Sequence, residues 1–258
     1  CIQPLVENVL AEYHGEGYET VGLAGSGFGG NEVMIDSALA VIEGIRFLSP
    51  GVRNALSVGG GHFLLAFFDA EGRYREHVTN PPCASGTGSF LEQQAERLRM
   101  TPTEFAARAA AYTGRVPTVA TRCAVFAKSD IIHAMQEGFS ADAIAAGVCR
   151  GIARNLLDTL LKGRTLTAPL VVVGGVALNK KIIDTLAELT GIRVVVPEHA
   201  RLAGAVGAAL LGRDTLPQTS ALFERQSETA AVRPRLSLTL SDYPDFSPIT
   251  RGTEGEVE

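Results

Sequence analysis

Two cysteines that stand directly before helical patterns are the residues with the clearest chemical potential. Cys83 opens the run Cys-Ala-Ser-Gly-Thr-Gly-Ser-Phe, and Cys123 opens the run Cys-Ala-Val-Phe-Ala-Lys-Ser-Asp. The positive end of a helix dipole lowers the pKa of a thiol and favours an anion there. Most free cysteines are small buried hydrophobic residues, but two in matching positions favour a chemical role. Cys149 instead lies on an apolar helical stripe, which predicts a core residue.

Three glycine-rich segments are candidates for binding a nucleotide. They are residues 59–61 between two apolar runs, 86–88 before a helical pattern, and 174–179 between an apolar run and a helix. Glycine lets the backbone approach a ligand closely, and the N–H groups of such turns can hold phosphate. Taken singly, each is explained as well by a plain turn, and none contains the Walker A ending or G-x-G-x-x-G. The candidate residues are Gly59, Gly60, Gly61, Gly86, Thr87, Gly88, Gly174, Gly175 and Asn179.

Composition and spacing exclude several other classes of protein. The 258 residues are 46% hydrophobic and 20% charged, with net charge −5 and no Trp. This composition is too apolar for a disordered chain. The negative net charge argues against a basic surface that would bind nucleic acid. No apolar run approaches the roughly 18 residues that cross a membrane, and four cysteines form no disulfide framework, which indicates reduced cytosolic thiols. The histidines have no metal-ligand spacing, and no catalytic residue can be selected.

The elements that must position these residues alternate between strands and helices over residues 1–212, which predicts an α/β fold. Residues 213–258 lose this periodicity and carry four prolines, so we expect a linker or tail. The expected strands are 19–24, 54–58, 63–68, 170–173 and 192–196, with a glycine hairpin between the second and third. The expected helices are 5–13, 35–48, 87–98, 102–112, 124–136, 141–162, 178–189 and 202–211.

Together these motifs resemble the ATPase activators of 2-hydroxyacyl-CoA dehydratases and the ATP-binding subunits of benzoyl-CoA reductases. The two cysteine motifs, 83–92 and 123–132, are the most specific part of the resemblance. Gly-Gly-Val-Ala-Leu-Asn at 174–179 is similar to the adenosine motif of that family, and 203–209 is similar to its closing helix. Gly59 and Gly60 fall at its second phosphate loop, and the resemblance covers residues 19–212.

The resemblance implies an actin-like ATPase fold with two ribonuclease-H-like lobes. We expect an N-terminal lobe at 1–80 and a C-terminal lobe at 81–212, with a cleft between them and helix 202–211 at their junction. The first phosphate hairpin of the family, with its Asp-x-Gly pattern, has no counterpart in the sequence. The N-terminal lobe is therefore expected to be incomplete.

The resemblance also implies cofactors and partners. Cys83 and Cys123 would bind a 4Fe-4S cluster shared across a homodimer, because such a cluster takes four thiolates. ATP or ADP with Mg²⁺ would bind at the glycine segments. The family's partners are a 2-hydroxyacyl-CoA dehydratase or CoA-ester reductase and an electron donor such as ferredoxin or flavodoxin. A cytoplasmic activator that couples ATP hydrolysis to low-potential electron transfer is the leading interpretation.

Three departures from the family pattern, of which the missing first phosphate hairpin is one, leave alternatives open. Ser57 and His62 stand where the second phosphate loop of the family carries acidic residues, and Pro82 replaces a basic residue. Because acidic groups there help to hold Mg²⁺ or orient water, we expect weak or absent hydrolysis. A non-catalytic relative that acts as a docking module of a larger activase is the alternative. A small-molecule kinase of the same superfamily is disfavoured by the paired cysteines.

Overall fold

The structure is a computed structural model that describes residues 9, 11–12, 15–16, 25–26, 34–80, 87–121 and 123–213. Contacts divide the chain into two units, Cys1–Leu222 and Phe223–Glu258, and every described residue belongs to the first unit. The predictions for Cys83, for Gly86, for strand 19–24, for most of helix 5–13 and for the tail after residue 213 fall outside the described residues.

A five-stranded mixed sheet, with strand order β5-β4-β3-β6-β7, forms the centre of the first unit. The central pair β3 and β6 is parallel, with Asn54 opposite Leu170 and Ser57 opposite Val173. Every residue of these two strands is buried, as expected for a parallel pair with both faces covered. The strands are β3 (Asn54–Val58), β4 (Phe63–Phe68), β5 (Tyr74–Thr79), β6 (Leu170–Val173) and β7 (Val194–Val195).

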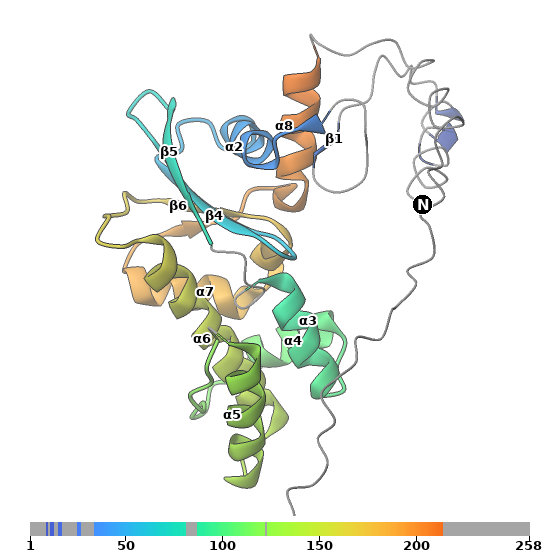
Figure 1. The fold of residues 1–258 in the computed structure, drawn as a ribbon, viewed down its shortest axis with the longest axis vertical. Coiled ribbons are helices and arrows are strands. Elements are labelled where there is room, and N and C mark those ends of the chain that lie inside the picture. Colours follow the sequence, from blue (N-terminus) through green and yellow to red (C-terminus); the bar gives the residue numbers. More distant parts are fainter. Residues whose placement is uncertain are drawn as a thin grey trace, which may run out of the picture. The chain divides into compact units, whose positions relative to one another are not determined.

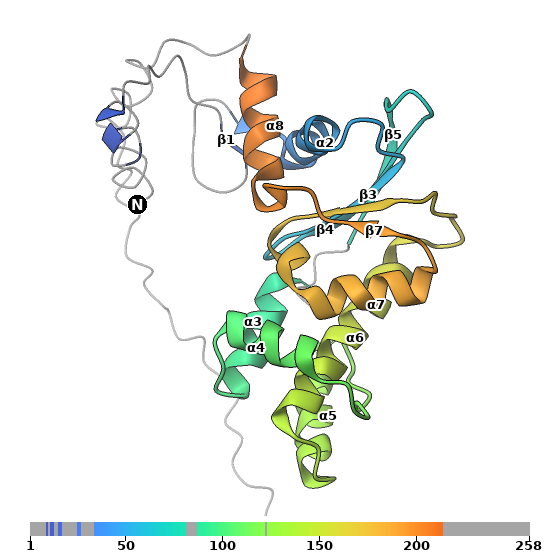
Figure 2. The ribbon, with the colours of Figure 1, turned by 180° about the vertical axis from the view of Figure 1, so that it is seen from behind.

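Helices lie on both faces of this sheet (Figures 1 and 2). On one side are α6 (Ala141–Leu160) and α7 (Lys180–Thr190), and on the other are α2 (Ser37–Leu48) and α8 (Ala203–Gly212). The last two pack so closely that a Cβ on Gly44 or Gly207 would overlap the backbone of the facing helix. The two glycines therefore allow α2 and α8 to pack this closely. Asp36 caps α2 by accepting hydrogen bonds from the N–H groups of its first turn.

The remaining described elements are short or lie away from the centre of the sheet. They are α3 (Gly88–Arg97), α4 (Pro102–Ala111), α5 (Ala124–Gln136), the 3-10 turns η1 (Gly175–Leu178) and η2 (Ala200–Leu202), and the short parallel pair β1 (Gly25–Ser26) and β2 (Met34–Ile35). Thr101 and Glu104 form a capping box at the start of α4. Among the described helices, none is long and apolar enough to span a bilayer.

Most of the expected elements within the described residues are present with nearly the expected bounds. The strands 54–58, 63–68 and 170–173, their hairpin, and helix 124–136 are confirmed. The sequence prediction missed β5, because Tyr74–Thr79 is mostly polar and forms an edge of the sheet. The strands β3, β4 and β5 come before residue 80 and pair into one sheet with β6 and β7, which come after it.

Candidate functional site

The predicted glycine segments meet at one cavity of about 670 Å³, which we call the glycine pocket. The loop between β3 and β4, the start of α3, the η1 turn with the start of α7, and one side of α4 form its lining. Residues that the sequence singled out and that line it are Gly59, Gly60, Gly88, Gly175 and Asn179. Gly61, Thr87 and Gly174 do not line the pocket.

Two of the glycine segments are joined to each other by their backbones. The N–H groups of Gly88 and Ser89 donate to the carbonyl oxygens of Gly59 and Gly60, each at 2.9 Å. A Cβ on Gly88 would lie 3.2 Å from the oxygen of Gly59, so a side chain at this position would press on the loop. The hairpin loop thus satisfies donors at the N-terminus of α3, and the pocket wall is set by main-chain contacts.

The third glycine segment turns sharply where β6 ends. Gly174 has a φ of 93°, which only glycine adopts readily, and a Cβ there would overlap the backbone of Val58. Its N–H donates to the carbonyl oxygen of Ala200 at 2.9 Å. Gly175 follows with open space, since a Cβ there would meet nothing within 4 Å. Gly174 therefore shapes the turn, and Gly175 leaves room in the pocket.

Asn179 has a structural partner that the sequence did not indicate. Its side-chain Oδ1 accepts the N–H of Ile182 at 3.2 Å and so caps α7, while Nδ2 donates to Cys149 Sγ at 3.4 Å. Burial raises the pKa of Cys149 to about 12, so its thiol stays protonated at neutral pH. The prediction that Cys149 is a core residue is confirmed.

The charged side chains that line the glycine pocket are Glu92, Lys180 and Arg201. Lys180 also pairs with Asp184 at 2.7 Å. Glu92 is the one carboxylate among the described lining residues, and Ser57 is not among them. Ser57 lies within β3 and is 9% exposed. The described part of the pocket thus has positively charged side chains that suit an anionic ligand, and few side-chain oxygens that could bind a metal ion.

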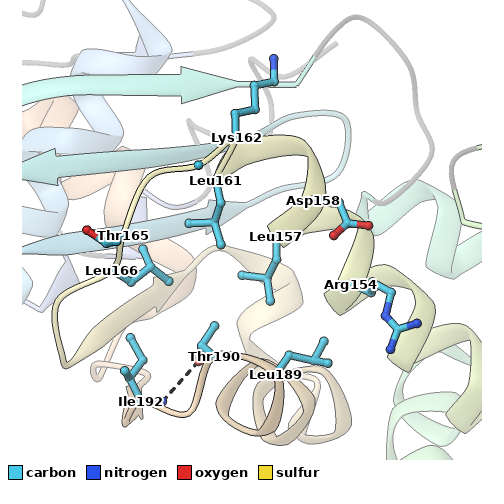
Figure 3. Close-up of a pocket in the computed structure, with 11 residues that line it drawn as sticks. Arg154, Leu157, Asp158, Leu161, Lys162, Thr165, Leu166, Leu189, Thr190 and Ile192 are labelled. Carbon is cyan, nitrogen blue, oxygen red and sulfur yellow. Dashed lines mark hydrogen bonds between the residues drawn. The ribbon is translucent and has the colours of Figure 1, made fainter.

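A second cavity, also of about 670 Å³, lies between the C-terminal ends of α6 and α7 and contains none of the predicted site residues. Figure 3 shows Leu157, Leu161 and Leu166 gathered on the side that faces Ile192. The side chain of Lys162 points away from these leucines in the same view. Five of the predicted residues therefore line the glycine pocket, and none lines this second cavity.

Cys123 is the N-cap residue of α5, and no hydrogen bond from its side chain caps the helix. It is partly buried, whereas Cys149 is fully buried and bonded to Asn179. A thiol at a helix N-terminus suits a thiolate ligand, and a protonated core thiol does not. In the part of the chain that the structure describes, no three His, Cys, Asp or Glu side chains gather as metal ligands. Of the two described cysteines, Cys123 is therefore the one whose position suits a thiolate.

The first turn of α5 exposes two large apolar side chains beside Cys123, next to the exposed Lys128 and Ser129. Val125 is 70% exposed and Phe126 is 65% exposed, while Ala127 and Ile131 turn inward to the core. Exposed apolar side chains that lie together on one helix are typical of a surface that contacts another protein.

The chain belongs to the BadF/BadG/BcrA/BcrD ATPase family, whose model matches residues 6–212. The match covers the sheet, the glycine pocket and Cys123, and it confirms the resemblance found in the sequence.

Two proteins with similar sequences are named as dehydratase activators. The chain is 30% identical over 172 residues to the 2-hydroxyisocaproyl-CoA dehydratase activator of Clostridioides difficile, covering 67% of this chain and 64% of the relative. It is 33% identical over 168 residues to the activator of lactoyl-CoA dehydratase of Anaerotignum propionicum, covering 65% of this chain and 64% of the relative. The chain thus spans slightly less than two thirds of the length of these two activators.

A solved structure supports the fold. The activator of the 2-hydroxyisocaproyl-CoA dehydratase from Clostridium difficile with bound ADPNP is 26% identical and has a TM-score of 0.72, with 81% of this chain and 80% of that chain covered. The predicted α/β, actin-like ATPase fold is confirmed.

Proposed function

We propose that the chain is an ATP-binding, iron–sulfur activator domain of a 2-hydroxyacyl-CoA dehydratase or a related CoA-ester reductase. The activity would couple ATP binding and hydrolysis to the delivery of one electron, from a donor such as ferredoxin or flavodoxin, to the partner enzyme. The relatives named as dehydratase activators support the partner class. A cytoplasmic location is part of the proposal, because thiolate ligands require reduced cysteines.

The observation that carries the proposal is the meeting of three glycine segments at one pocket. Gly60, Gly88 and Gly175 belong to three separate segments of the chain. Because glycine has no side chain, the pocket is lined by main-chain atoms at these three positions. Lys180 and Arg201 add positive charge that suits phosphate groups. The related activator structure contains ADPNP, a nucleotide, which supports nucleotide binding at the equivalent place in this chain.

The cysteines support the second half of the proposal. Cys123, with Cys83, would provide two thiolates from each chain to a 4Fe-4S cluster in a homodimer. When bound, the cluster supplies one-electron transfer at low potential. The N-terminus of α5 stabilises negative charge at Cys123, and the exposed Val125 and Phe126 offer apolar surface to the partner subunit.

A second candidate function is a non-catalytic docking module. Ser57 is buried in β3, and Glu92 is the one described carboxylate at the pocket. These features favour nucleotide binding with weak or absent hydrolysis by this chain alone. A turnover equal to that of an intact dehydratase activator would contradict the module hypothesis.

Calorimetry with ATP and ADP, with and without Mg²⁺, tests nucleotide binding. Gly175→Val adds a side chain to the pocket lining where space is open, so we expect affinity to fall about tenfold or more. Ala111→Val, at an exposed position of α4 outside the lining, is the matched control and should bind as the unmodified chain does. Absence of binding, or equal affinity in Gly175→Val, would contradict the proposal.

A further inference from the structure

The segment that leads to Cys123 packs closely against two glycines of α6. Gly147 and Gly151 are one helical turn apart, and a Cβ on Gly147 would lie 2.5 Å from the oxygen of Pro117. A Cβ on Gly151 would lie 2.8 Å from the oxygen of Val119 and 2.7 Å from Thr121 Cγ2. Glycine is unfavourable inside a helix relative to alanine, so two of them here indicate a packing requirement.

Hydrogen bonds from two helices fix the end of this segment. Thr121 Oγ1 donates to the carbonyl oxygen of Gly151 at 2.9 Å, and Asn155 Nδ2 donates to the carbonyl oxygen of Thr121 at 3.4 Å. The N–H of Ala120 donates to Asp130 Oδ2 on α5 at 2.7 Å. Thr121 and Asn155 are both buried, and the hydrogen bond between them is shielded from water.

We infer that Thr121 is a positioning residue that holds Cys123 in place through α6. Thr121 lies two residues before Cys123, and its hydroxyl ties the chain to the helix turn that carries Gly151. Cys149 of the same helix accepts a hydrogen bond from Asn179, which lines the glycine pocket. The role toward a cluster rests on the proposed function, whereas the placement of Cys123 does not.

Labelling of Cys123 in the metal-free chain, followed by peptide mass spectrometry at fixed pH, tests the placement. Thr121→Val keeps the shape but removes the donor, and we expect labelling to become about fivefold faster, as for loss of one buried hydrogen bond. Thr121→Ser keeps the hydroxyl and should restore the original rate. Thr185→Val is the control, because Thr185 is a buried threonine that donates to a helix carbonyl, that of Lys181, at 2.7 Å.

Asn155→Ala provides a second variant, with the same expected direction, and thermal unfolding shows whether each variant is folded. In the reconstituted protein, Thr121→Val should shift the midpoint potential, while Thr121→Ser and Thr185→Val should not. Unchanged labelling in both Thr121→Val and Asn155→Ala would overturn the inference, even if every variant binds iron. Faster labelling without any iron binding would support the inference and contradict the proposed function.

Discussion

The glycine pocket and the Cys123 region are built in different ways. The pocket is assembled from backbone, with Gly59 and Gly60 bonded to the start of α3 and Gly174 packed against Val58. Cys123 begins a helix whose outward side chains Val125 and Phe126 remain exposed. The pocket is therefore preorganised within one chain, whereas the cysteine region has a surface that a second chain can cover.

The largest expected effect is a loss of stability from a substitution in the turn beside the glycine pocket. Gly174→Ala puts a Cβ into the backbone of Val58 at a positive φ, so we expect the free energy of unfolding to fall by about 3 kcal/mol. Gly175→Ala is the matched control, because its Cβ meets nothing within 4 Å. Chemical denaturation measures both, and equal stability of the two variants would contradict this account of the turn.

A smaller effect is expected at the cysteine region. Phe126→Ser removes apolar surface beside Cys123, so dimerisation of the iron-loaded protein should weaken about tenfold or more. Phe47→Ser, at a 61% exposed phenylalanine on α2, should leave dimerisation unchanged. Analytical ultracentrifugation under anaerobic conditions measures the difference, and equal weakening in both variants would argue against a specific interface.

The smallest effect concerns Cys149, which is bonded to the pocket residue Asn179 from α6. Its folded pKa of about 12 exceeds the reference value of 9.0, so its contribution to stability is complete below pH 9 and is lost as pH rises toward 12. Between pH 8 and 10 the chain should lose about 1 kcal/mol more stability than Cys149→Ala. Denaturation curves at both pH values measure this, and parallel losses would contradict a protonated core thiol.

The sequence predicted the local elements better than their assembly. Apolar runs and glycines located β3, β4 and β6 correctly, because burial and turn chemistry act over short distances. The polar strand β5 and the Asn179–Cys149 bond depend on contacts between distant residues, so no local pattern indicated them. For the same reason the sequence could not separate Gly175, which lines the pocket, from Gly61, which does not.

Anaerobic iron–sulfur reconstitution tests the central claim most directly. Iron and sulfide content would be measured for the unmodified chain and for Cys83→Ser, Cys123→Ser and Cys149→Ser. The account predicts that the first two variants lose the cluster and that Cys149→Ser retains it, because a ligand must be a thiolate and the Cys149 thiol stays protonated beside Asn179. Iron content and dimerisation equal to the unmodified chain in both Cys83→Ser and Cys123→Ser would contradict it.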